Sequence, residues 1–106
     1  PSAEALVSTL RESVPVAGTR RVVLAVSSDK DYRGMLQILA GYFDHFHLTR
    51  YGNPRGVPPE KLAAVLAEVA TGKPYTLHAT SHEAWAAARA AAGQLDLICV
   101  TGSVFL

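Results

Sequence analysis

The segment from Arg21 to Val26 (RVVLAV) is a continuous run of β-branched and aliphatic residues that begins with one arginine. Such a run is typical of a strand that is covered on both faces, as in a parallel sheet. Shorter strand-like segments are expected at residues 46–49, 75–79 and 95–100. A stretch with apolar residues at helical spacing precedes each of the four strands, so the sequence predicts a helix–strand alternation repeated four times.

The expected helices carry recognisable start signals. Ser2 suits the cap of the first helix, and Pro58 with Pro59 suits the first turn of the third. Thr80 with Glu83 three residues later forms a capping box before an Ala-rich fourth helix. Strands that alternate with helices favour right-handed crossovers and a mostly parallel sheet. We therefore expect a Rossmann-like three-layer α/β sandwich with helices on both faces, truncated at both ends.

Length and composition narrow the class further. The chain has 106 residues, 49% of them apolar and 18% charged, with a net charge of +1, which favours one folded domain over residues 1–106. Its basic residues form no stripe, which argues against nucleic acid as a partner. The single cysteine, Cys99, excludes an internal disulfide and a multi-cysteine zinc site. Apolar runs are too short to span a membrane and no signal segment is visible, so we expect a cytoplasmic domain without a membrane partner.

Polar residues gather in the loops expected after the strands, where open α/β sheets bind ligands. In the first of these loops, Asp29 and Asp31 flank Lys30, an arrangement suited to a carboxylate or phosphate ligand. The alternative is that Asp31 caps the second helix, Asp29 lies in the field of that helix and Lys30 points into solvent.

Two further loops offer a cation and a hydroxyl. Arg55, between Pro54 and Gly56, either makes a bidentate contact with a carboxylate or is a solvated loop arginine. Ser103 either positions a substrate or caps a following helix, because its surroundings do not match a nucleophile elbow.

Other site chemistries have little support in the sequence. His45 and His47 lie two residues apart, but no cysteine pair and no H-E-x-x-H motif supplies further ligands, so we expect structural histidines and no metal site. Neither G-x-x-x-x-G-K-[ST] nor G-x-G-x-x-G occurs, so binding of ATP or NAD by those routes requires another domain.

The order of the motifs along the chain is more informative than any one of them. The motifs are, in order, Ser28-Asp29-Lys30-Asp31, Gly34-Met35-Leu36, Asn53-Pro54-Arg55-Gly56 before a Pro-Pro-Glu-Lys-Leu helix, Glu83-Ala84-Trp85, and residues 100–106 (VTGSVFL). That series resembles the C-terminal domain of the bacterial folylpolyglutamate synthase and dihydrofolate synthase family, within the Mur ligase superfamily, over about residues 2 to 106.

The resemblance implies an ATP-dependent ligase that joins the amine of L-glutamate to a carboxylate of folate or dihydropteroate. In that family ATP phosphorylates the carboxylate, Mg²⁺ neutralises the transferred charge, and the amine displaces phosphate. A larger N-terminal domain holds ATP, Mg²⁺ and most of the folate site. By resemblance Lys30 and Ser103 contact glutamate, with Asp29, Asp31 and Arg55 beside them, and this chain itself supplies no catalytic, cofactor or metal residue.

One departure bears on activity. Members of the family carry an Asp-Gly-Ala-His-Asn-type segment that approaches the nucleotide, and the chain starts at Pro1, just downstream of its place. The tail helix expected after Leu106 is also absent from the sequence. We therefore expect a non-autonomous domain without ligase activity, whose exposed sheet edge permits a homodimer. The alternative is a non-catalytic α/β binding or regulatory module of the same fold.

Overall fold

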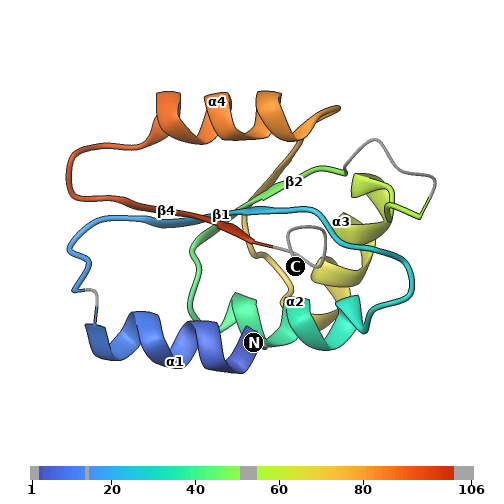
Figure 1. Cartoon of the computed structure of the whole chain (residues 1–106), viewed down its shortest axis with the longest axis horizontal. Helices are drawn as coiled ribbons and strands as arrows, with labels where there is room; N and C mark the ends of the chain where they lie inside the picture. The colour runs from blue at the N-terminus through green and yellow to red at the C-terminus, as the bar shows by residue number, and fades with distance from the viewer. Residues whose placement is uncertain (1–2, 14, 51–54, 102–106) are drawn as a thin grey trace.

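The computed structural model describes residues 3–13, 15–50 and 55–101, which form four helices and four strands in strict alternation. Figure 1 shows their arrangement in three layers. In chain order the elements are α1 (Ala3–Ser13), β1 (Arg20–Leu24), α2 (Tyr32–Ala40), β2 (His45–Leu48), α3 (Pro59–Val69), β3 (Tyr75–Leu77), α4 (Ser81–Ala91) and β4 (Leu97–Thr101). The expected alternation is confirmed, and each strand bound lies within two residues of its expected position.

The strands of the described part form one sheet in the order β3-β2-β1-β4. All three strand pairs are parallel, as the long connections through helices require. β1 is central: Val22 lies opposite Phe46 of β2 on one side and Cys99 of β4 on the other. Its last three residues are buried, which confirms the prediction drawn from the aliphatic run.

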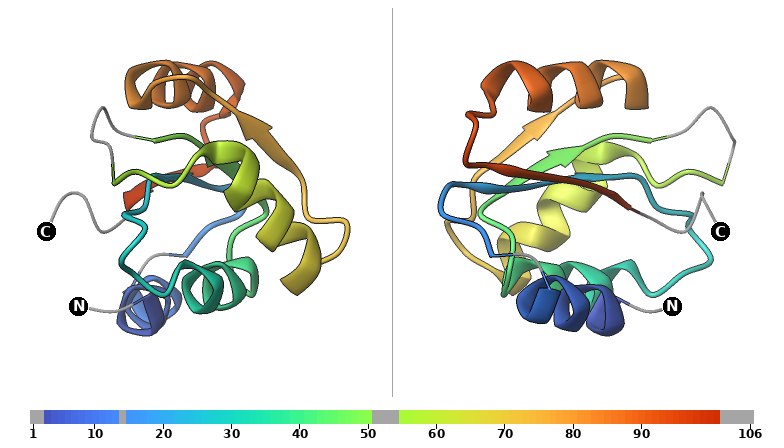
Figure 2. Two further views of the ribbon diagram at one scale, coloured as in Figure 1. Left: turned by 90° about the vertical axis from the view of Figure 1, so that its right-hand side faces the viewer. Right: turned by 60° about the vertical axis from the view of Figure 1, so that its left-hand side comes forward.

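The two faces of the sheet are covered differently (Figure 2). On one face α1, α2 and α3 pack against alternate strand residues, and the largest members of this core are Phe43, Phe46 and Leu24. On the other face α4 packs alone, with Ala84 and Ala88 fully buried against Val23 and Ile98. Small alanine side chains let this helix approach the sheet closely, as its Ala-rich sequence predicts.

β3 is far more exposed than the central strand β1. Its three residues are all exposed, and Tyr75 and Leu77 are 45% and 40% exposed. In the described part of the chain β3 lies at one end of the sheet and pairs with β2 alone. The sequence alone does not show which strand occupies an edge, so it gives no expectation for the exposure of this strand. No helix in the same part is long and apolar enough to span a bilayer.

Two helix starts carry the caps that the sequence predicts. The Asp31 carboxylate accepts the amide N–H of Gly34 at 3.0 Å, and the Thr80 hydroxyl accepts that of Glu83 at 3.1 Å. Each bond satisfies one N–H that a helix start leaves without a partner. These caps set where α2 and α4 leave the carboxyl edge of the sheet.

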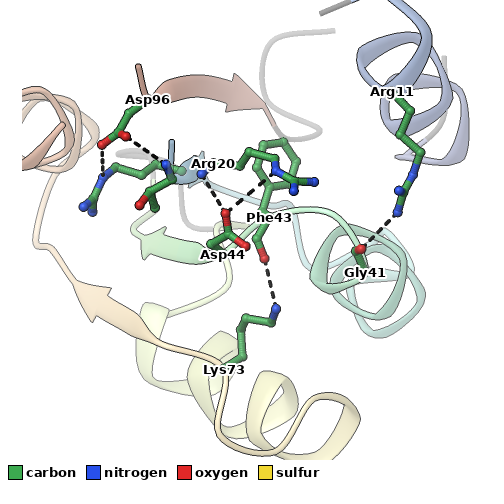
Figure 3. Close-up of polar contacts among 9 residues, drawn as sticks. Arg11, Arg20, Gly41, Phe43, Asp44, Lys73 and Asp96 are labelled. Carbon is green, nitrogen blue, oxygen red and sulfur yellow. Dashed lines mark hydrogen bonds and ion pairs between the residues drawn. The ribbon is translucent and has the colours of Figure 1, made fainter. Parts of the chain in front are cut away.

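At the opposite, amino edge, the Asp96 carboxylate makes several polar contacts, some of which Figure 3 shows. Its carboxylate accepts the amide N–H of Thr19 at 2.8 Å and that of Gly93 at 2.9 Å. The same carboxylate lies 3.9 Å from the guanidinium of Arg21. These contacts hold the pKa of Asp96 below its usual range, the two backbone hydrogen bonds contributing most.

Candidate functional site

The loop after β1 and the segment that begins at Arg55 lie together at the carboxyl edge of the sheet. The amide of Ser28 donates to the carbonyl of Arg55 at 2.7 Å, and the amide of Val57 donates to the carbonyl of Val26 at 2.9 Å. Between these two bonds Ser27 and Gly56 form an antiparallel bridge. Backbone hydrogen bonds therefore hold the loop after β1 against the segment at Arg55, although the two are far apart in the sequence. The sequence leads us to expect both at one site.

The side chains of these two loops form a cluster of charges in which Asp29 lies near Lys30 and Arg55. Its carboxylate accepts a hydrogen bond from the hydroxyl of Ser27. That bond is the main reason why the pKa of Asp29 lies below its ordinary value, and the positive charges of Lys30 and Arg55 lower it further. The site therefore presents an ionised carboxylate with two cations near it.

Lys30 and Asp31 have different positions in the same turn. The amide of Lys30 donates to the carbonyl of Ser27 at 3.1 Å, and its side chain is exposed. The Asp31 carboxylate caps α2, and a Cβ on Gly34 would clash with it. Of the two interpretations of this loop, the structure confirms helix capping by Asp31, and a role of Asp31 beside a bound ligand stays a prediction.

β4 ends beside this cluster, which is where the sequence expects a further loop. Thr101 lies opposite Leu24 of β1, and its carbonyl accepts the amide of Ala25 at 3.4 Å. Ser103 itself lies outside the described residues. The structure thus brings Asp29, Lys30 and Arg55 together and leaves the predicted role of Ser103 as a prediction.

A second polar cluster lies on the face of the sheet that α4 covers. His47 is 3% exposed and connects Arg21 to His78 through its two ring nitrogens, at 3.3 Å and 3.1 Å. His45 contacts the hydroxyl of Thr76 at 2.8 Å. The sequence predicts structural histidines at 45 and 47, and these contacts agree, but it gives no signal for His78. That contact depends on β3 pairing with β2, which the sequence does not show.

A family model described as "Mur ligase, glutamate ligase domain" matches residues 1–104. The chain belongs to this glutamate ligase domain family. The match covers nearly the whole chain, so the fold and the arrangement of loops are those of a Mur-type glutamate ligase domain. No curated protein sequence matches it.

Solved structures agree with the family. FolC from Escherichia coli in complex with ADP has a TM-score of 0.82 and 28% identity, over 92% of this chain and 22% of that one. Folylpolyglutamate synthase from Mycobacterium tuberculosis, complexed with ADP and AMPPCP, has a TM-score of 0.83 and 29% identity, over 96% and 24%. A bifunctional folylpolyglutamate synthase/dihydrofolate synthase with Mn, AMPPNP and L-glutamate bound has a TM-score of 0.77 and 26% identity, over 97% and 23%. The glutamate ligase domain therefore spans less than a quarter of the length of these proteins.

Proposed function

We propose that this chain is the C-terminal, glutamate-side domain of a larger two-domain ligase that uses ATP to add L-glutamate to folate or dihydropteroate. One observation carries the proposal: ionised Asp29 lies near the cations Lys30 and Arg55 at the carboxyl edge of the sheet. L-Glutamate has two carboxylates and one ammonium group, so a site with two cations and one anion complements its charges. A similar structure with L-glutamate bound supports the same ligand class.

In the proposed site each side chain has a simple task. Arg55 suits a bidentate contact with one glutamate carboxylate, and exposed Lys30 supplies a charge to the other. The Asp29 carboxylate faces the ammonium group and accepts hydrogen bonds from it while the substrate is positioned. Ser103 would add a hydroxyl, and Asp31 acts indirectly by fixing the start of α2.

The ligation forms a bond between the glutamate nitrogen and the carbonyl carbon of the folate carboxylate, and phosphate leaves from the acyl phosphate. ATP supplies that phosphoryl group and Mg²⁺ is its usual partner. The described residues contain no group of three or more His, Cys, Asp or Glu side chains arranged to hold a metal ion. We propose that ATP and Mg²⁺ bind in another part of the enzyme.

A ligase assay with labelled L-glutamate, dihydropteroate and ATP tests this function in a chimera in which the chain replaces the matching part of E. coli FolC. The chain alone should give background incorporation, and the chimera should give turnover. In the chimera, Lys30→Ala and Arg55→Ala should each raise the KM for glutamate by about tenfold or more, because a hydrogen bond to a charged group is lost. The KM for ATP should stay unchanged.

Arg89→Ala is the matched control, because Arg89 is exposed in the last turn of α4 and stacks over Trp85, away from the loops of the site. It should leave both KM values in place. An active chimera whose KM for glutamate does not respond to Lys30 or Arg55 would exclude the proposed site. Turnover by the chain alone would contradict the proposal that ATP binds in another domain. No turnover in the chimera would instead favour the alternative, a non-catalytic binding or regulatory module.

A further inference from the structure

A recess of about 270 Å³ opens at the amino edge of the sheet, at the opposite end of the strands from the site described above. Arg11 of α1, Arg20 at the start of β1 and Tyr42 after α2 line it together with Pro15 and Val16. Neither the resemblance nor the proposed function gives these residues a role.

The two arginines of the recess are held in place by the same aromatic ring. The guanidinium carbon of Arg20 lies 4.7 Å from the centroid of the Tyr42 ring, and that of Arg11 lies 5.3 Å from it. Tyr42 is 4% exposed and packs edge-to-face on Phe43 at 5.0 Å, so the ring is a fixed support. Both cations are thus positioned before any ligand arrives, which lowers the entropy cost of binding.

The hydrogen-bonding capacity of these arginines is only partly used (Figure 3). One terminal nitrogen of Arg11 donates to the carbonyl of Gly41 at 3.0 Å. The Nε of Arg20 is buried without a hydrogen-bond partner among the described residues, and the nearest Asp44 oxygen is 3.8 Å away. A guanidinium carries five N–H donors, so both groups retain donors for a planar or tetrahedral oxyanion.

The charge balance of the recess favours an anion. Asp44 is the acid that pairs with Arg20, and its side chain is 49% exposed. The same carboxylate also accepts the backbone N–H of Arg20 at 2.8 Å, so it is directed partly towards the main chain. Two cations against one half-exposed carboxylate leave a net positive charge beside Tyr42.

We propose that the Arg11–Arg20–Tyr42 recess is a second binding site of this chain, which takes a small oxyanion such as phosphate or a phosphate- or carboxylate-bearing metabolite. The volume admits a small molecule only, and Pro15 and Val16 provide an apolar wall for a short carbon skeleton. The site is separate from the glutamate-side loops and does not depend on the proposed ligase function.

Two-dimensional amide NMR of the chain, titrated with inorganic phosphate at constant ionic strength, tests the proposal. Saturable shifts are expected at residues 11, 20 and 42, with a dissociation constant of about 0.1 to 10 mM for an exposed two-arginine site. Succinate in a parallel titration distinguishes a site for any oxyanion from one that requires phosphate, and sodium chloride is the control for screening.

Three variants make the result specific to the recess. Arg11→Gln should weaken phosphate binding severalfold because it removes one positive charge from the recess, and Asp44→Asn should strengthen it by about two- to five-fold because it removes the negative charge. Arg33→Gln is the matched control, because Arg33 is an exposed arginine of α2 that pairs with Glu68 at 3.2 Å. The amide spectrum of each variant verifies that it is folded.

Absence of saturable shifts at residues 11, 20 and 42 with either anion would overturn the proposal. Equal weakening by Arg11→Gln and Arg33→Gln would overturn it too, because that result indicates general attraction to surface charge. Because phosphate is read at residues 11, 20 and 42 and glutamate at residues 28–31 and 55–57, failure of one site is distinguishable from failure of the other.

Discussion

A guanidinium nitrogen of Arg21 lies 3.3 Å from Nε2 of His47. A guanidinium only donates, so this nitrogen of His47 accepts and the neutral ring carries its proton on Nδ1. That proton is directed to Nε2 of His78, 3.1 Å away. One directed chain of hydrogen bonds therefore joins β1, β2 and the residue after β3, and it requires His47 to be neutral.

Stability should fall as the pH is lowered through the range in which histidine titrates. Burial lowers the pKa of His47 to about 4, helped by the charges of His45, His78 and Arg21. Burial also lowers the pKa of His45. It lowers the pKa of His78 as well, although the negative charge of Glu83 acts in the opposite direction there. Because the folded state keeps these rings neutral, it binds fewer protons than the unfolded chain below about pH 6.5. Urea unfolding should show full stability above pH 6.5 and a loss of about 2 kcal/mol towards pH 4.5.

His47→Gln removes the most shifted of these rings, so its stability should depend less steeply on pH between 6.5 and 4.5. His82→Gln is the control, since His82 is exposed in the first turn of α4, and it should keep the slope of the unmodified chain. If His47→Gln keeps that slope as well, the directed chain of hydrogen bonds does not govern stability in acid.

Gly18 should tolerate no side chain. A Cβ at this position would overlap Asp96 and lie 2.8 Å from the carbonyl oxygen of Leu95, which belongs to the backbone and cannot swing away. Gly18→Ala should destabilise the chain by about 1–3 kcal/mol, as overpacking does. Gly93→Ala, whose Cβ would meet Asp96 at an ordinary 4.0 Å, should change the free energy of unfolding by less than about 0.5 kcal/mol. Equal effects of the two substitutions in thermal or urea unfolding would contradict this account of the amino edge.

Asp31 should behave as a helix cap rather than as a substrate contact. Asp31→Ala removes the acceptor for the Gly34 amide and should cost about 1 kcal/mol of stability, whereas Asp31→Asn keeps an acceptor and should cost less. Urea unfolding of both variants measures the difference. If the Asp31→Ala variant is as stable as the unmodified chain, the capping bond does not stabilise α2, and a role of Asp31 in ligand binding is favoured instead.

The approach of α4 to the sheet should depend on alanine at position 88. Ala88 is fully buried against Val23 and Ile98, so Ala88→Leu should destabilise the chain by about 1–3 kcal/mol. Ala90 is exposed on the same helix, and Ala90→Leu should stay within about 0.5 kcal/mol of the unmodified chain. A tolerated leucine at position 88 in thermal unfolding would show that this layer is loosely packed.

Local signals explain which features the sequence predicts well. The caps at Asp31 and Thr80 act within three residues, and the aliphatic run of β1 reflects burial on both faces, so short segments contain the information. Other features involve segments that are 26 or more residues apart in the sequence. They include the contact of Arg21 with His47, the contact of Arg11 with Gly41 and the pairing that places β3 at an edge of the sheet. They depend on strand order and register, which no local pattern encodes. The loops of Asp29 and Arg55 lie together, as the sequence leads us to expect, because carboxyl ends of parallel strands share one edge.

The most direct test of the central claim is an amide NMR titration of this chain with L-glutamate and, separately, with magnesium-ATP. The account predicts saturable shifts for L-glutamate confined to residues 28–31 and 55–57, reduced by Arg55→Ala and kept by Arg89→Ala, with no such shifts for ATP. Shifts for L-glutamate elsewhere, or shifts at these loops that Arg55→Ala leaves unchanged, would contradict the assignment of the glutamate site to the cluster around Asp29.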